Sequence, residues 1–356
     1  MSKKSIFAIA VLLLAALFVF QKERILTAVF NKGLEVRLSS DTIAELKDGL
    51  HVALCGAGGP LSGPNASGPC VAVIAGDRMF VVDAGTDGLR NLGRMGLGAG
   101  AIEAVFLTHF HSDHIDGLGE MATIRWVSVA NTQPLPVYGP RGVQQVVDGF
   151  NSVYAMDETY RYEHHGDTVA PLSGSGMVAK EFTAPKFDEL AVLYDEPDLK
   201  IEALLVEHAP VTPAVGYRFT YKGRSVLITG DTKASDNVLT FSKGIDLLVH
   251  EALAPNLVMM MNAAAKKADN KVLEKITADI LDYHASPKEA AQIAKQAGVG
   301  HLLYYHIVPP LVIPGQESLF LDGADDIFPD YTVGQDGVMF SMPIGSNGIN
   351  LVRKGL

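Results

Sequence analysis

The chain has 356 residues, of which 48% are apolar and 19% are charged, and its formal net charge at pH 7 is −11. This apolar content suffices for a large folded core and excludes a disordered chain. The acidic balance disfavours nucleic acid as a partner, because local basic patches hold phosphate backbones and the sequence shows no such patch.

The N-terminus carries the pattern of an export signal. Lys3 and Lys4 precede fifteen uninterrupted apolar residues, 6–20, which end at the polar run 21–24. Fifteen residues suit the core of a signal peptide and fall slightly short of the roughly 17–25 that span a bilayer. A small-residue cleavage site is missing, which favours an uncleaved anchor over a cleaved signal. We therefore expect an exported protein, anchored in the inner membrane and facing the periplasm, or periplasmic if the signal is cleaved.

Three segments follow from this pattern: 1–24 as signal anchor or signal peptide, 25–48 as a linker helix, and 49–356 as the catalytic domain. A first strand at 51–54 leads into loop 56–69, which is rich in glycine and proline and predicts a turn beside the active site, where close backbone approach needs glycine. Cys55 and Cys70 bracket this loop. They could form a disulfide, and two reduced core thiols are an equally consistent alternative.

Two strands, 71–75 and 79–82, form a predicted hairpin that ends at Asp83. The next apolar strand, 104–107, runs into Thr108-His109-Phe110-His111-Ser112-Asp113-His114. His109 and His111 are two positions apart at a strand end and point the same way, and a turn can bring Asp113 and His114 to a second metal. Zinc accepts imidazole and carboxylate together, so this loop predicts a metal site in preference to a polar loop with incidental histidines.

The pattern His109-x-His111-x-Asp113-His114, preceded by Leu107-Thr108, resembles the signature of the metallo-β-lactamase superfamily. The resemblance implies an α/β fold: an αββα sandwich of two mixed β-sheets flanked by helices, here preceded by an N-terminal hydrophobic helix. It also implies a dinuclear metal centre at one edge of the sandwich. Asp83 would support the metal loop from behind the ligands, and a cap for a helix at 89–95 is the alternative or additional role.

Three later strand ends complete the ligand set that the resemblance implies. A strand at 199–206 leads to His208, an apolar strand at 225–229 leads to Asp231, and a strand at 301–306 ends at His306. One metal would take His109, His111 and His208, the other would take Asp113, His114 and His306, and Asp231 would bridge them.

Further positions resemble ribonuclease Z and the zinc-dependent arylsulfatases of the same branch. His250 and Glu251 match a stretch that lies close to the centre behind the ligands, and His284 matches a non-ligand histidine near the leaving group. Asp113 or His284 would then act catalytically by protonating or orienting the departing oxygen. His284 as a helix-terminal residue without chemistry is the alternative. The methionine cluster 259–261 is either core or a flexible substrate wall.

These features predict a dinuclear zinc hydrolase, with Mn²⁺ or Fe²⁺ as alternative metals, that cleaves a small anionic ester by attack of metal-bound hydroxide. The substrate would be an aryl sulfate or a phosphodiester. A ribonuclease Z-like tRNA 3′-processing endonuclease is the alternative, but the 23 positions from His208 to Asp231 leave no space for a tRNA-gripping arm, and the acidic surface and export signal also weigh against it. A metal-dependent binding or sensing protein is the non-enzymatic alternative. The expected partners are the small ester and, through the N-terminal helix, a membrane; a homodimer is left open.

Overall fold

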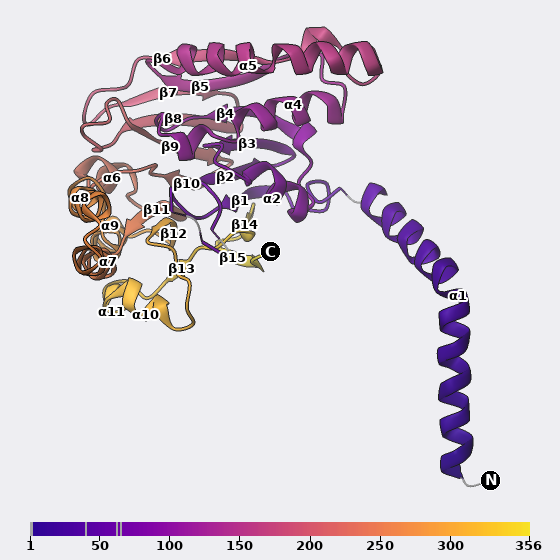
Figure 1. Cartoon of the computed structure of the whole chain (residues 1–356). Coiled ribbons are helices and arrows are strands. Elements are labelled where there is room, and N and C mark those ends of the chain that lie inside the picture. Colours follow the sequence, from indigo (N-terminus) through magenta and orange to yellow (C-terminus); the bar gives the residue numbers. More distant parts are fainter. Residues whose placement is uncertain (1–2, 40, 62, 65) are drawn as a thin grey trace. The chain divides into compact units, whose positions relative to one another are not determined.

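The computed structural model describes residues 3–39, 41–61, 63–64 and 66–356, and the chain divides into the two units Met1–Thr42 and Ile43–Leu356 (Figure 1). The first unit contains one continuous helix, α1 (Lys3–Ser39), over the predicted hydrophobic helix and most of the predicted linker. The three-part division into 1–24, 25–48 and 49–356 stays a prediction.

The expected membrane anchor is not supported by the helices of the chain. Among the described residues, none forms a helix that is both long enough and apolar enough to cross a membrane. This finding corrects the expectation of a chain that is exported and held at the inner membrane. The physical reason lies in the apolar run itself, which stops after fifteen residues at Gln21-Lys22-Glu23-Arg24 and is shorter than the roughly 17–25 residues that a spanning helix needs.

The second unit contains two mixed β-sheets. The eight strands of the first sheet stand in the order β15-β14-β1-β2-β3-β4-β5-β6, and the seven strands of the second in the order β13-β12-β11-β10-β9-β8-β7. The strands of the first sheet are β1 (Gly49–Gly56), β2 (Cys70–Ala75), β3 (Arg78–Val82), β4 (Ile102–Phe106), β5 (Leu135–Pro140), β6 (Met177–Phe182), β14 (Val338–Pro343) and β15 (Asn350–Lys354). The strands of the second are β7 (Leu190–Asp195), β8 (Leu199–Leu205), β9 (Val215–Tyr221), β10 (Arg224–Ile228), β11 (Leu247–Leu253), β12 (His301–Val308) and β13 (Tyr331–Val333).

Helices cover the outer face of each sheet (Figure 1). Against the first sheet lie α2 (Gly88–Met95), α4 (Leu118–Ser128) and α5 (Val143–His165), whose apolar residues share one buried cluster with the strands. A corresponding cluster on the second sheet includes residues of α6 (Asp236–Phe241), α7 (Pro255–Lys267), α9 (Pro287–Ala297), α10 (Gln316–Leu321) and α11 (Ala324–Ile327). The remaining helical segments are α3 (Ser112–Ile115), α8 (Lys271–Asp279), η1 (Ala99–Ala101), η2 (Leu172–Gly174) and η3 (Ile280–Asp282).

A third apolar cluster fills the space between the two sheets. Phe106 of β4 lies at its centre, with ring centroids 5.4 Å from Tyr217 and 5.7 Å from Phe219, both on β9. Such edge-to-face contacts fix the sheets against one another, because aromatic pairs add specific geometry to area burial. The four layers confirm the predicted αββα sandwich.

The glycine-rich loop between β1 and β2 is closed at its base by a disulfide, Cys55–Cys70, so the structure realises the paired alternative for the two cysteines. Within the loop, a Cβ added to Gly59 would lie 2.8 Å from Cε1 of His306. Only glycine allows the backbone to pass so close to this imidazole, in agreement with the predicted close approach.

Candidate metal centre

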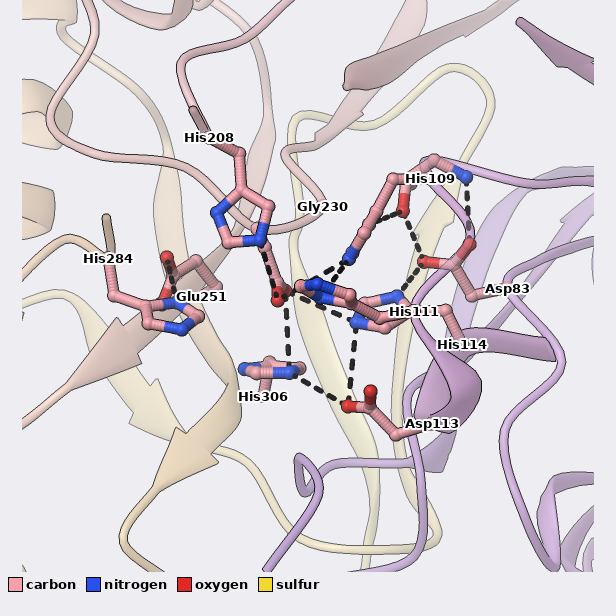
Figure 2. A network of polar contacts seen from close by, with 12 residues as sticks. Asp83, His109, His111, Asp113, His114, His208, Gly230, Glu251, His284 and His306 are labelled. Atoms are coloured by element: carbon pink, nitrogen blue, oxygen red, sulfur yellow. Dashed lines mark hydrogen bonds and ion pairs between the residues drawn. The ribbon is translucent and has the colours of Figure 1, made fainter. Parts of the chain in front are cut away.

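One half of the site comes from the first sheet. His109 and His111 follow the end of β4, and Asp113 and His114 lie on the single turn of α3. The two-residue spacing brings Nε2 of His109 within 3.0 Å of Nδ1 of His111, as predicted for side chains that leave a strand end in one direction. Figure 2 shows these side chains gathered around one point.

The other half comes from the second sheet. His208 follows β8, Asp231 follows β10, and His306 lies within β12. In the pairing of β11 with β12, Glu251 lies opposite Tyr305 and Ala252 lies opposite Ile307, so His306 has no partner residue on β11. The φ of His306 is 44°. An extra residue of this kind re-aims a side chain, and the strained φ is typical of functional positions. The bulge therefore turns His306 towards the site.

The seven predicted ligands converge in the structure. Potential ligand atoms lie within 4.8 Å of one another in three sets: His109, His111, His208 and Asp231; Asp113, His114 and His306; and Asp231, His284 and His306. Asp231 and His306 each belong to two of these sets, and the bridging position of Asp231 stays a prediction. The role of these residues as ligands stays a prediction.

Several buried atoms in this cluster have no hydrogen-bond partner, and three of them are Nε2 of His114, Nε2 of His208 and Oδ1 of Asp231. Nε2 of His114 lies 3.4 Å from Oδ1 of Asp231, so two of these atoms face each other across the centre. Buried polar atoms are normally satisfied, and an unsatisfied group indicates an unplaced water or ion. A divalent metal would satisfy all three, so the residues fit the metal centre that the sequence predicts.

Burial keeps two of the clustered imidazoles neutral. Burial lowers the pKa of His109 well below its usual value and lowers the pKa of His111 as well. Both rings are therefore neutral near pH 7, which is the form that binds a metal. Burial opposes ionisation of Asp231, but the charges of His306 and His114 outweigh it and lower the pKa of this carboxyl. Neutral imidazoles at His109 and His111 beside an ionised carboxylate suit zinc. Burial opposes protonation of His114, but the neighbouring carboxylates raise its pKa well above its usual value, so a metal must displace a proton from this ring.

Asp83 holds the metal loop from behind. Its Oδ1 accepts a hydrogen bond from the backbone N–H of Thr108 at 2.8 Å, and its Oδ2 accepts from Oγ1 of Thr108 at 2.8 Å and from Nδ1 of His114 at 2.9 Å. Carboxylates in this position fix the tautomer and orientation of a ligating histidine. Asp83 does not cap α2, because the N-cap of that helix is Asp87.

His284 lies at the open side of the cluster, hydrogen-bonded through Nδ1 to Oε1 of Glu251 at 2.9 Å (Figure 2). Burial opposes protonation of His284, but the charge and hydrogen bond of Glu251 raise its pKa to about 9. Glu251 also accepts from the backbone N–H of Thr232 and of Ala285, at 3.0 and 3.2 Å. His250 points elsewhere: it is buried and hydrogen-bonded through Nδ1 to the carbonyl of Glu251 at 2.7 Å.

Sequence reasoning missed several supporting groups. The carbonyl of Tyr283 accepts from Nδ1 of His208 at 2.9 Å, and no side-chain pattern signals a backbone acceptor. Asp336 accepts hydrogen bonds from Ala57 and Ser67, which stand at the two ends of the loop beside the site. A cavity of about 280 Å³ lies against the cluster, and α8 supplies part of its wall. The methionine cluster is divided, since Met261 lines this cavity while Met259 and Met260 are exposed.

Comparison with known proteins agrees with this architecture. A family model described as "Beta-lactamase superfamily domain" matches residues 78–307. Ribonuclease Z of Mycobacterium bovis (strain BCG / Pasteur 1173P2) is 36% identical over 271 residues, covering 76% of this chain and 89% of that protein. Ribonuclease Z of Mycobacterium tuberculosis (strain ATCC 25618 / H37Rv) is 34% identical over 271 residues, with the same coverage of 76% and 89%.

Solved structures share the fold. The crystal structure of human tRNase Z, short form, superposes with a TM-score of 0.58 at 21% identity and covers 83% of this chain and 100% of that one. The metallo-beta-lactamase fold protein YhfI from Bacillus subtilis gives a TM-score of 0.58 at 22% identity, with coverage of 83% and 100%.

These relatives correct the expectation that nucleic acid is disfavoured and that a small ester is the partner, because the matching proteins are named ribonuclease Z. The expected membrane partner is corrected by the finding that no helix among the described residues can span a membrane. The error about nucleic acid arose from the net charge of −11, which describes the whole surface and not the field at one site. The relatives do not support the arylsulfatase reading either. With the family model, the relatives and the sandwich in agreement, the chain belongs to the metallo-β-lactamase superfamily and is related to the ribonuclease Z proteins.

Proposed function

We propose that the chain is a metal-dependent phosphodiesterase that cleaves RNA, as its relatives' name ribonuclease Z suggests. The observation that carries the proposal is the convergence of seven candidate ligand side chains, several of which have buried atoms without a hydrogen-bond partner. The 36% identity over most of both chains favours a phosphodiester substrate over a sulfate ester.

In this proposal His109, His111 and His208 hold one metal, and Asp113, His114 and His306 hold the second, with Asp231 shared. Two divalent ions at such a site, when bound, supply a nucleophile near neutral pH and offset the charge of a phosphodiester. Zinc is the metal we propose, because imidazole and carboxylate together suit it. The positive charge of the centre also explains how an acidic chain can bind RNA at one point.

The chain's own residues would then orient the reaction. Asp83 and the Tyr283 carbonyl fix the rings of His114 and His208. His284 would donate a proton to the departing ribose oxygen, since its raised pKa of about 9 leaves it protonated at neutral pH. Glu251 would hold that imidazole in place.

The test is a side-by-side assay of a precursor tRNA with a 3′ extension, bis(4-nitrophenyl) phosphate and 4-nitrophenyl sulfate. We expect cleavage of the two phosphodiesters and none of the sulfate ester. Asp231→Ala should abolish this cleavage, whereas Asp236→Ala, at an exposed acid of α6, should retain it. Preferred turnover of the sulfate ester would refute the proposal.

A further inference from the structure

The cavity beside the candidate metal centre has two unlike sides. Its polar side consists of His111, Asp113, Asp231, His284 and His306, which belong to the cluster described above. Its other side is apolar and is formed by Leu61, Met261, Leu273, Ile276, Ile280 and Val308. A substrate whose phosphate lies at the polar side must place a neighbouring group against the apolar side.

Half of these apolar residues, Met261, Leu273 and Ile276, lie on one helical hairpin, α7 and α8. The hairpin starts directly after β11, which carries Glu251, and ends just before His284. Asn262 of α7 donates through Nδ2 to the carbonyl of Glu274 at 2.7 Å and to Oγ1 of Thr277 at 2.8 Å. Thr277 is buried, so this contact braces the two helices. The hairpin thus lies in the chain between Glu251 and His284, the two residues of the candidate proton donor pair.

The charge and size of the cavity restrict what it can hold. Among the described residues that line it, none is a lysine or an arginine, so a second phosphate would find no cation there. Its volume of about 280 Å³ is near the lower end of small-molecule sites, roughly 300 Å³, which gives room for one ring system and not for a duplex.

Two features favour a planar aromatic group. Tyr283 lines the cavity, and its ring stands 4.9 Å from the ring of His208 and 4.7 Å from that of His284, which presents an aromatic surface beside the centre. Ile276 is 48% exposed at the same cavity, so the chain's own packing does not cover it. Unpaired bases of single-stranded RNA stack on such aromatic and apolar surfaces.

We propose that this cavity holds the unpaired nucleobase of a nucleotide next to the scissile phosphate, and that Ile276 and Leu273 are specificity-determining residues. The inference rests on the proposed function and adds to it the recognition of a single flanking base. The substrate class is therefore RNA with an unpaired nucleotide at the cleaved bond.

The test uses the full chain and three precursor tRNAs: one unmodified, and two that carry an abasic ribose on either side of the cleaved bond. We expect one abasic substrate to lose about tenfold in kcat/KM, the effect of one lost base stack. Ile276→Asn should lower kcat/KM for the unmodified RNA by a similar factor and leave that abasic RNA nearly unaffected. Val272→Asn, on α8 at a side chain 70% exposed and outside the cavity, is the matched control and should change neither.

Equal cleavage of all three RNAs by the wild-type chain would overturn the inference while leaving the proposed function standing. An equal loss on all three RNAs in Ile276→Asn, with unchanged metal content, would also overturn it, because the residue would then act on the centre and not on the base. If the wild-type chain cleaves none of the RNAs, the proposed function fails and this inference fails with it.

Discussion

Asp336 organises the loop beside the site, and replacing it should be costly. Its carboxylate is buried and accepts hydrogen bonds from four donors: the backbone N–H of Ala57 at 3.0 Å, the backbone N–H of Ser67 at 3.0 Å, Oγ of Ser67 at 2.6 Å and Nδ2 of Asn91 at 2.9 Å. Ala57 and Ser67 stand at the two ends of the loop that carries Gly59, Pro60 and Leu61. One side chain from the far end of the chain therefore pins both ends of the loop.

The change Asp336→Asn keeps the shape and removes one acceptor oxygen. About two of the four donors lose their partner, and the new amide N–H₂ faces them. A hydrogen bond to a charged group contributes about 1.5–3 kcal/mol, so we expect the free energy of unfolding to fall by about 3–6 kcal/mol. This is a large part of the ~5–15 kcal/mol that stabilises a typical domain. Because Pro60 and Leu61 line the cavity, we also expect KM to rise more than kcat falls.

Urea unfolding measures the change in stability. Steady-state kinetics without urea, under conditions where the variant is folded, then measure KM and kcat. Asp326→Asn is the matched control, since Asp326 is exposed on α11 and its neutralisation should shift the midpoint little. An unchanged midpoint in Asp336→Asn would refute the claim that this carboxylate anchors the loop, and a fall in kcat without a rise in KM would refute its role in positioning the cavity wall.

Three further outcomes are expected. Elemental analysis should find about two zinc ions per chain, and chelation should lower the unfolding temperature, because a metal that binds only the folded state stabilises it; one ion or none would contradict two metal sites. His284→Ala should lower kcat for RNA by about 10²–10⁴-fold with metal content retained, as for loss of a general acid, and loss of metal together with activity would instead make His284 a ligand. His51 lies outside the cluster, and burial lowers its pKa in the folded chain below that in the unfolded chain. As the pH falls through about 6.5, the unfolded chain therefore binds a proton at His51 and the folded chain does not. Stability present above that pH is lost below it, and His51→Gln should show a smaller fall in urea midpoint between pH 7.5 and 5.5 than the wild type.

The part of the site that is contiguous in sequence was predictable, and the part assembled from distant segments was predictable only where a family pattern marks it. His109 to His114 carry their own evidence, because the spacing on a strand end fixes the directions of the side chains. His208, Asp231 and His306 stand alone in the sequence, and their convergence was expected through resemblance. The bulge at His306 and the contact of Asp336 with Ala57, 279 positions away, depend on register and packing, which local patterns do not encode.

The expectation that nucleic acid is disfavoured failed for a related reason. The net charge of −11 argues against RNA only for the surface as a whole. The short span from His208 to Asp231 argues only against a tRNA-gripping arm at that place. Neither property describes the field or the shape of the site itself. The cavity wall includes α7 and α8, and of these two segments only the methionine cluster 259–261 was marked in the sequence. Which of their apolar side chains face the centre is decided by how the hairpin packs, as the different exposures of Met260 and Met261 show.

Two of the three candidate metal sets draw ligands from both sheets, whereas the third, Asp231, His284 and His306, comes from the second sheet alone. His109 and His111 come from the first sheet and His208 from the second, and Asp113 and His114 come from the first and His306 from the second. Two contacts hold this junction: the hydroxyl of Tyr217 donates to the carbonyl of Leu107 at 2.6 Å, and the backbone N–H of Val215 donates to the carbonyl of Thr108 at 3.0 Å. A metal held by either of these two sets would favour the docked sandwich over a state in which the sheets separate, because it binds residues of both sheets. The aromatic core between the sheets therefore contributes to the geometry of the centre, because it packs the two sheets that carry its candidate ligands against each other.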